Sequence, residues 1–223
     1  MTALCHFAFV RFTREYWALP AADREARLDA WIADLRRSAH AVDVYHVFPA
    51  ARDADVCVWS SEVADGQDTA ARFFAAFQRA CAPMRAYAEF ADILWGYTKP
   101  SPYSSATRSA QALDPFGRER PRYLVVYPFV KTADWYLKSR EERQQIMNGH
   151  IRIGKQYPDI SQLLLYSVGL QDQEFVPVYA MDSLERFSEL VAELRGTEAR
   201  RFTERDWPLR VGYGPIAGSN RWS

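Results

Sequence analysis

The hydrophobic residues of this chain follow two patterns, short runs of strand-forming side chains and longer stretches with intervals of three or four. Residues 4–13 read LCHFAFVRFT, which predicts a strand. Residues 20–38 form a longer stretch. In it Leu28, Trp31 and Leu35 lie at helical spacing, which predicts an amphipathic helix with one buried face. The first half also predicts strands at 42–48, 56–59 and 93–97 and a helix from 69 to about 89 that Asp68 can cap.

The same order of elements, β-α-β-β-α-β, recurs in the second half. TREYW at 13–17 lies 119 positions before TADWY at 132–136, and helix and strand starts keep about the same offset. Two split βαβ units can pack their sheets together, so we predict an α+β fold in which two ferredoxin-like βαββαβ repeats form one barrel. The second half predicts strands at 122–132, 161–169, 174–179 and 209–213, and helices at 140–156 and, capped by Asp182, up to about 201.

The segment between the repeats, 98–121, is rich in Ser, Pro, Arg and Ala. It separates a first repeat at 1–97 from a second repeat at 122–223. A loop this long is uncommon inside a compact domain, so it is either a linker or a lid over a site. We favour a lid. Its basic residues are then candidate contacts for carboxylates: Arg108, Arg118 and Arg120.

Composition narrows the class of protein. The 223 residues are 48% hydrophobic and 25% charged, as in ordinary globular proteins, and 14% aromatic, which suits a large apolar pocket or a subunit interface. A formal net charge of zero removes the electrostatic argument for nucleic acid or an anionic membrane as a partner. No apolar run is long enough to span a bilayer, so membrane insertion is not expected.

Cysteine usage and the first residues indicate the compartment. Cys5, Cys57 and Cys81 are few, odd in number and far apart, so they predict neither a disulfide framework nor a metal cluster. The opening MTALCHFAFVRF reads as a strand rather than as a leader peptide. We therefore expect a cytoplasmic location.

One histidine stands out in the second half. Ser139 and Glu142 form a capping box, which predicts that a helix begins there. On that helix Ile146 and Met147 precede His150 by four and three residues, so His150 lies on the apolar face. Most histidines in such positions are core residues with satisfied ring nitrogens. The alternative is a metal or haem-iron ligand.

The surroundings of His150 favour haem over zinc. No second histidine or cysteine lies nearby at the spacing of a zinc site, whereas a single axial histidine suits haem iron. The residue 119 positions earlier is Trp31, an expected core residue. A bulky hydrophobe in one repeat and a histidine in the other indicates that only the second half carries a site, unless the two positions diverged without purpose.

Polar residues on the neighbouring strands are further candidates. Tyr127, Phe129 and Lys131 alternate along one predicted strand and so share a face. There Lys131 can ease tyrosinate formation or hold an anion, unless it simply faces solvent beside a half-buried tyrosine. Gln162, in a strand of leucines, is either an edge residue or, if it faces the barrel, a ligand contact.

Three charged residues lie near the end of the last predicted helix, Arg195, Glu198 and Arg200. Any one of them alone is best explained as part of a solvated helix terminus. As a set beside a cavity, the two arginines would suit carboxylates, which guanidinium binds with two parallel hydrogen bonds. Glu198 could accept the second ring N–H of His150 and orient the imidazole.

Together these segments resemble the chlorite dismutase superfamily of haem proteins, and within it the coproheme decarboxylases, which are peroxide-dependent haem synthases. The resemblance covers residues 122–202, where YPFVK with DWY, MNGHIRIG, SVGLQDQEF and LRGTEARRF follow in specific order and spacing. It implies a ferredoxin-like repeat in each half and a homo-oligomer, commonly a pentamer.

The resemblance also implies roles for individual residues. His150 becomes the proximal iron ligand, and Tyr127 becomes a radical that abstracts hydrogen from a propionate, assisted by Lys131. Gln162 falls at the distal position, where true chlorite dismutases place an arginine, and this favours decarboxylation. Trp135 falls where the family has a tryptophan close to the site. The expected porphyrin contacts are Phe129, Trp135, Gln162, Arg195, Arg200 and Arg108, with Glu198 behind His150.

Two positions depart from the family pattern. The propionate-binding serine of the family falls at Arg200, and its upstream arginine falls at about Leu113, so a lid arginine would have to substitute. A distal histidine base, found in one branch of the decarboxylases, is absent from the second half.

The expected function is oxidative decarboxylation of iron coproporphyrin III to haem b. Hydrogen peroxide is the oxidant, and the porphyrin is both substrate and redox centre. A chlorite dismutase or weak haem peroxidase is one alternative. A haem-binding or haem-transfer protein without turnover is another, and an α+β barrel oligomer without haem is a third.

Overall fold

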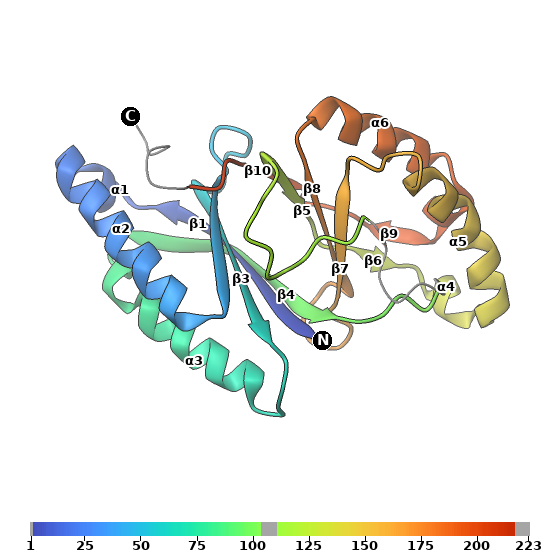
Figure 1. Cartoon of the computed structure of the whole chain (residues 1–223), viewed down its shortest axis with the longest axis horizontal. Coiled ribbons are helices and arrows are strands. Elements are labelled where there is room, and N and C mark those ends of the chain that lie inside the picture. Colours follow the sequence, from blue (N-terminus) through green and yellow to red (C-terminus); the bar gives the residue numbers. More distant parts are fainter. Residues whose placement is uncertain (1, 104–110, 217–223) are drawn as a thin grey trace.

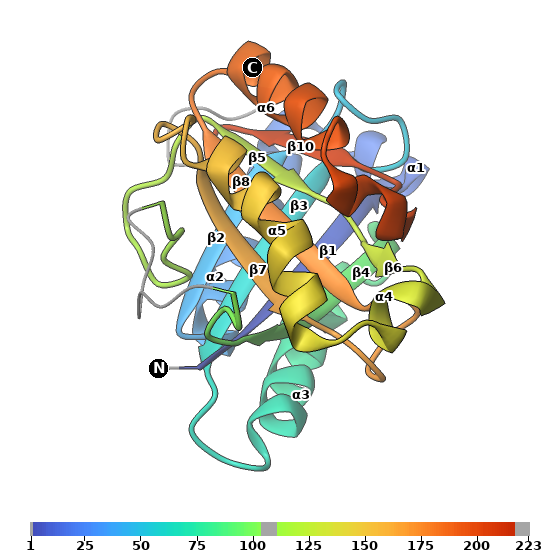
Figure 2. The ribbon, with the colours of Figure 1, turned by 90° about the vertical axis from the view of Figure 1, so that its right-hand side faces the viewer.

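The computed structural model describes residues 2–103 and 111–216 and contains a closed barrel of eight strands (Figure 1). Helices α2 and α3 cover the barrel on one side, and α5 and α6 cover it on the other (Figures 1 and 2). The helices are α1 Arg14–Trp17, α2 Ala21–Ser38, α3 Thr69–Cys81, α4 Ala133–Leu137, α5 Arg140–Gly154 and α6 Leu184–Arg195, with 3-10 helices η1 Ala82–Met84 and η2 Glu198–Phe202.

The strands confirm the expected fold class. Their order around the barrel is β1-β3-β2-β10-β5-β8-β7-β4, and every pairing is antiparallel. A two-stranded sheet of β6 and β9 lies beside it. The bounds are β1 Ala3–Phe12, β2 Ala41–His46, β3 Val56–Val63, β4 Ala88–Thr98, β5 Tyr123–Val126, β6 Val130–Lys131, β7 Ser161–Tyr166, β8 Phe175–Met181, β9 Thr203–Arg205 and β10 Arg210–Tyr213.

The repeat is visible in the order of strands. The first half contributes β4-β1-β3-β2 as one run of neighbours, and the second half contributes β10-β5-β8-β7 as another. Helices α2 and α5 begin at Ala21 and Arg140, which are 119 residues apart. Strands β3 and β8 begin at Val56 and Phe175, at the same offset. Trp31 and His150 therefore occupy equivalent turns of equivalent helices.

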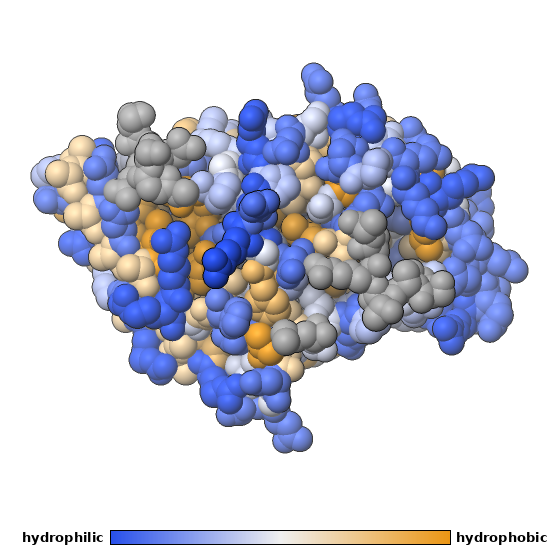
Figure 3. All heavy atoms as spheres, viewed as in Figure 1, coloured by the Kyte–Doolittle hydropathy of each residue, from blue (hydrophilic) through white to orange (hydrophobic). Residues whose placement is uncertain are grey.

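Alternation along each strand divides the core into layers. In β8, Val178 packs inside the barrel while Tyr179 packs outside it, beneath α6. The interior also holds Phe7 and Trp59, stacked at 5.4 Å between ring centroids. Trp31 on α2 lies in the outer core of the first half. The solvent-facing sides of α5 and α6 are hydrophilic (Figure 3), as expected for amphipathic helices.

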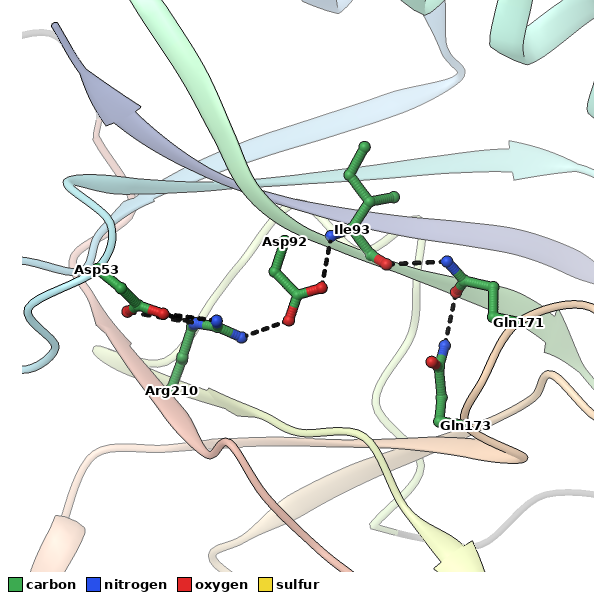
Figure 4. Close-up of polar contacts among 6 residues, drawn as sticks. All are labelled: Asp53, Asp92, Ile93, Gln171, Gln173 and Arg210. Carbon is green, nitrogen blue, oxygen red and sulfur yellow. Dashed lines mark hydrogen bonds and ion pairs between the residues drawn. The ribbon is translucent and has the colours of Figure 1, made fainter.

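Side chains complete the barrel where its two halves meet. Strands β4 and β7 pair at Tyr97–Tyr166 and Thr98–Leu165. Farther along β4, the side chain of Gln171 takes the place of the paired strand. Its carboxamide accepts from the Trp95 backbone N–H at 2.8 Å and donates to the Ile93 carbonyl at 2.9 Å. Gln171 thus satisfies backbone groups that a strand partner would otherwise bind (Figure 4).

A buried arginine on β10 forms ion pairs with residues from two other segments of the barrel (Figure 4). Arg210 on β10 is 5% exposed and contacts Asp53, in the β2–β3 loop, at 2.6 Å and Asp92, on β4, at 2.7 Å. Its guanidinium also lies 4.5 Å from the Phe9 ring centroid. Both carboxylates are needed because a buried cation without partners is costly.

Several expected boundaries were wrong, and most errors trace to proline or glycine. The predicted strand at 122–132 is interrupted after Val126, because Pro128 has no N–H to donate, and resumes only as β6. The helix expected to reach residue 89 ends at Cys81 just before Pro83, and β4 follows it. The strand expected at 161–169 ends at Tyr166, ahead of Gly169 with φ 74°.

The helix caps also differ from expectation. Asp68 stands at the N-cap position, just before α3, but its side chain makes no capping hydrogen bond. Ser183 caps α6 by accepting from the Arg186 N–H, whereas Asp182 accepts from the backbone N–H of Arg122. Helix α6 ends at Arg195, before Gly196, and is followed by η2. Within the described residues, no helix is long and apolar enough to cross a membrane.

Candidate functional site

His150 is the half-buried histidine of α5. The predicted capping box is present: Ser139 Oγ accepts from the Glu142 N–H at 3.2 Å, and the Glu142 carboxylate accepts from the Ser139 N–H at 2.8 Å. One face of this helix packs through Ile146 on Trp135. His150 lies one turn further on, half-buried, and its Nδ1 atom is buried without a hydrogen-bond partner.

The electrostatics of His150 keep its ring neutral. Burial lowers the pKa of His150 to about 4, and the nearby Lys131 ammonium contributes to this shift. At neutral pH the ring therefore carries a nitrogen lone pair that can bind a metal. An unpartnered ring nitrogen in a neutral imidazole fits an axial ligand to porphyrin iron better than a satisfied core histidine. The hydrogen bond in which Glu198 was expected to accept from a His150 ring N–H is not formed at Nδ1, and Glu198 is exposed.

Lys131 on β6 contacts the rings of two other predicted site residues, Phe129 and Trp135. Its ammonium lies 4.2 Å from the Trp135 ring centroid and 5.1 Å from the Phe129 ring centroid. Burial lowers the pKa of Lys131 to about 8, and the Glu174 carboxylate opposes that shift. Glu174 also accepts from the Lys131 backbone N–H at 2.7 Å. Lys131 is thus a cation held among aromatic rings and within electrostatic range of His150.

Tyr127 lies in the bend between β5 and β6, so it does not share a strand with Lys131 as predicted. Its ring stacks on Tyr179 with centroids 6.3 Å apart and planes 12° apart. Burial raises the pKa of Tyr127 well above its ordinary value; Tyr179 and Asp206 add to the shift, and Arg195 opposes it. Tyr127 is therefore a neutral phenol. Lys131 is not among the groups that shift it, so easing of tyrosinate formation is not supported.

Gln162 lies on the outer face of β7. Leu163 and Leu165 pack inside the barrel, so by alternation Gln162 and Leu164 point outward. Gln162 is exposed and faces Tyr179 in the β7–β8 register. Of the two alternatives for Gln162, the one in which it faces the barrel interior is therefore excluded. Its side chain lies instead on the outer face of the barrel, as that of Leu164 does.

The arginines that were predicted to contact substrate carboxylates differ in their surroundings. Arg195 and Arg200 converge on one carboxylate, Asp206, at 3.6 Å and 2.6 Å. Arg120 was wrongly placed in a lid, because its side chain is 2% exposed and binds Asp43 at 2.8 Å. Arg108 lies outside the described residues.

Other parts of the connecting segment pack on the barrel. Leu113 is buried in the barrel interior, and its backbone N–H donates to the Gln162 carbonyl at 2.9 Å. Ala112 forms a parallel bridge with Gln162. Arg118 is exposed. The residues just after 110 are thus held beside β7 rather than forming a separate linker.

Sequence reasoning missed three residues of this region, Tyr179, Glu174 and Asp206. Tyr179 alternates with interior residues of β8, so its outward direction could have been found from the strand pattern. Asp206 and Glu174 gave no local signal, because their partners are brought to them by the pairing of β6 with β9 and by the Phe129–Phe175 bridge.

The sequence is similar to a known protein family and to characterised relatives. A family model described as chlorite dismutase matches residues 22–214. A coproheme decarboxylase from Mycolicibacterium smegmatis is 28% identical over 172 residues, which are 76% of this chain and 71% of the relative. A coproheme decarboxylase from Staphylococcus carnosus is 35% identical over 118 residues, covering 49% of this chain and 45% of the relative.

Solved structures agree on the architecture. A putative chlorite dismutase superposes with a TM-score of 0.80 and 25% identity, covering 96% of this chain and 95% of that one. A haem-binding protein from Thermus thermophilus superposes with a TM-score of 0.73 and 20% identity, covering 96% and 92%, and at that identity the likeness concerns the fold alone.

Proposed function

Since the chain belongs to the chlorite dismutase family, we propose that it is a coproheme decarboxylase that uses hydrogen peroxide to convert iron coproporphyrin III into haem b. The observation that carries the proposal is the position of Gln162. It lies on the outer face of β7 opposite Tyr179, on which Tyr127 stacks. The family resemblance places an arginine at this position in chlorite dismutases. Relatives named coproheme decarboxylase support the same reading.

The residues present fit a bound iron porphyrin. His150 would hold the iron, since its imidazole is neutral at pH 7 and its buried Nδ1 is unpartnered. The apolar rings of Phe129 and Trp135 would contact the macrocycle near Lys131. When bound, the porphyrin iron supplies the two-electron chemistry that reduces hydrogen peroxide.

Tyr127 would perform the hydrogen transfer. A neutral phenol can lose a hydrogen atom to the oxidant and then take one from the β-carbon of a propionate, whereas a tyrosinate has no such hydrogen. Each conversion turns one ionised propionate, one proton and one hydrogen peroxide into one vinyl group, one carbon dioxide and two waters. Lys131, largely protonated at pH 7 with a pKa of about 8, would hold the propionate carboxylate beside Tyr127.

The replacement of Tyr127 by phenylalanine tests this role. Y127F should bind iron coproporphyrin III much as the wild type does and form no vinyl product on addition of peroxide, as followed by mass spectrometry of the extracted porphyrin. Tyr213→Phe is the matched control, because the Tyr213 hydroxyl donates to the Phe48 carbonyl at 3.1 Å, away from the candidate site. Vinyl formation by Y127F at the wild-type rate would remove Tyr127 from the mechanism.

A chlorite dismutase activity is the second candidate, supported by the match to the family model described as chlorite dismutase. Oxygen release from chlorite by the porphyrin-loaded protein, measured with an oxygen electrode, tests it. With Gln162 in place of the distal arginine, we expect oxygen release to be far slower than decarboxylation.

Assembly and location complete the proposal. We propose a homo-oligomer, with a pentamer favoured by the family resemblance. We also propose the cytoplasm, because all three cysteines are free and buried, as suits a reducing compartment.

A further inference from the structure

Two arginines and one aspartate form a cluster at the edge of the candidate site. Arg200 Nη1 lies 2.6 Å from Asp206 Oδ2, while Arg195 Nη2 lies 3.6 Å from the same oxygen. The Asp206 side chain is 19% exposed, against 57% for Arg195 and 41% for Arg200. The contact with Arg200 is therefore a hydrogen-bonded ion pair, and the contact with Arg195 is a longer electrostatic one.

The cluster borders on Tyr127. Strands β6 and β9 pair with Val130 opposite Arg205, so Asp206 continues past the end of this ladder, level with Phe129. Burial is the main cause of the raised pKa of Tyr127, and among the smaller contributions the Asp206 carboxylate raises that pKa and the Arg195 guanidinium lowers it. A substrate carboxylate that binds beside Tyr127 would thus lie next to the Asp206 carboxylate, which already contacts both guanidinium groups.

We propose that Asp206 is a built-in competitor for the substrate carboxylate, which occupies Arg200 and leaves Arg195 to bind a propionate. This inference rests on the proposed function, because the ligand is the carboxylate of a porphyrin. Asp206 thereby sets the affinity for carboxylate-bearing porphyrins. Arg195 is a substrate contact, and Arg200 is a positioning residue that acts by holding Asp206 away from Arg195.

The charges of the cluster explain why this arrangement is useful. Two adjacent guanidinium groups without Asp206 would repel each other and would attract two anions. With Asp206 present the cluster keeps one net positive charge, which matches one ionised propionate. The longer contact leaves the hydrogen-bond donors of Arg195 available for two-point binding of that carboxylate, whereas Arg200 is already engaged at 2.6 Å.

The competition makes a prediction that simple charge counting does not. Removal of Asp206 frees Arg200 and should tighten binding. Removal of Arg200 should weaken porphyrin binding more than removal of a distant positive charge would, because Asp206 can then pair with Arg195. In the double variant both the competitor and its holder are gone, so affinity should return close to that of the wild type. The two substitutions are therefore strongly non-additive.

The test is a binding titration with metal-free coproporphyrin III, followed by porphyrin absorbance and tryptophan fluorescence, which needs no turnover. We expect Asp206→Asn to lower Kd roughly two- to tenfold, and Arg200→Met to raise it by a similar factor. R200M/D206N should lie within about twofold of the wild type. The matched control is Asp159→Asn, which loses a partner of Arg186 at 3.5 Å on the solvent side of α6 and should leave Kd unchanged.

The outcomes separate this inference from the function on which it rests. Wild-type binding with equal Kd for D206N and D159N would overturn the competitor role and leave the decarboxylase proposal intact. A double variant that binds as weakly as R200M would also overturn it. Failure of the wild type to bind coproporphyrin III at all would overturn both. Thermal melts of each variant would identify any that does not fold. If R200M does not fold, the comparison of D206N with D159N carries the test, and if D206N does not fold, the comparison of R200M with R200M/D206N carries it.

Discussion

The buried Arg210 gives a quantitative test of how the barrel is closed (Figure 4). Replacement of Arg210 by methionine keeps a long apolar stem against the Phe9 ring but leaves Asp53 and Asp92 without their cation. Loss of one partner of a fully buried ion pair costs about 3–5 kcal/mol. Because the two carboxylates are 43% and 29% exposed, water can solvate them in part, so we expect about 2–4 kcal/mol.

The assay for this prediction is urea unfolding of the ligand-free protein with a thermal melt alongside. For a chain of this size, about 2–4 kcal/mol corresponds to a lowering of Tm by roughly 5–15 °C. Arg186→Met is the matched control, because Arg186 is 43% exposed and pairs with two half-exposed acids, so its loss should cost less than about 1 kcal/mol. Equal free energies of unfolding for R210M and R186M would refute the claim that the Arg210 pairs hold the barrel.

Three further predictions concern single sites. Burial lowers the pKa of His6 to about 3, so its contribution to stability is full above pH 6.5 and is lost as pH falls toward 3, about 2 kcal/mol of it by pH 5. His150, whose pKa is lowered to about 4, loses stability in the same pH range, so His6→Phe should reduce the loss measured by urea unfolding at pH 5 by about 2 kcal/mol without abolishing it; a loss as large as that of the wild type would contradict the shift. Gly96→Ala would place a Cβ 2.7 Å from the Tyr166 carbonyl oxygen, so the free energy of unfolding should fall by about 1–3 kcal/mol, measured as a lower Tm; an unchanged Tm would show that β4 and β7 can move apart without cost. Lys131→Met should raise the pKa of His150 in an NMR titration of the ligand-free protein, and no movement would place the ammonium out of range.

Local signals were enough for most elements of the fold. The Ser139 capping box located the start of α5 correctly, and the interval of 119 residues relates α2 to α5 as well as β3 to β8. The errors arose where a local signal was present but was given too little weight. Pro128 interrupts the predicted strand at 122–132, and Gly196 ends the last helix before the expected residue 201.

The candidate site was harder to predict because it is assembled from contacts between distant residues. The helical spacing of His150 and the aromatic neighbours of Lys131 were within reach of sequence patterns. The pairing of Arg120 with Asp43 joins residues 77 positions apart, and nothing near either residue indicates it. Asp206 likewise meets Arg195 only because Gly196 ends α6 and η2 turns the chain toward β9.

The measurement that tests the central claim most directly is a titration of the purified protein with iron coproporphyrin III, followed by stepwise addition of peroxide and mass analysis of the porphyrin. We predict a Soret shift on binding and then the loss of two carboxyl groups in sequence, through an intermediate with three propionates. Binding followed by no loss of carboxyl groups, whatever the amount of peroxide, would contradict it.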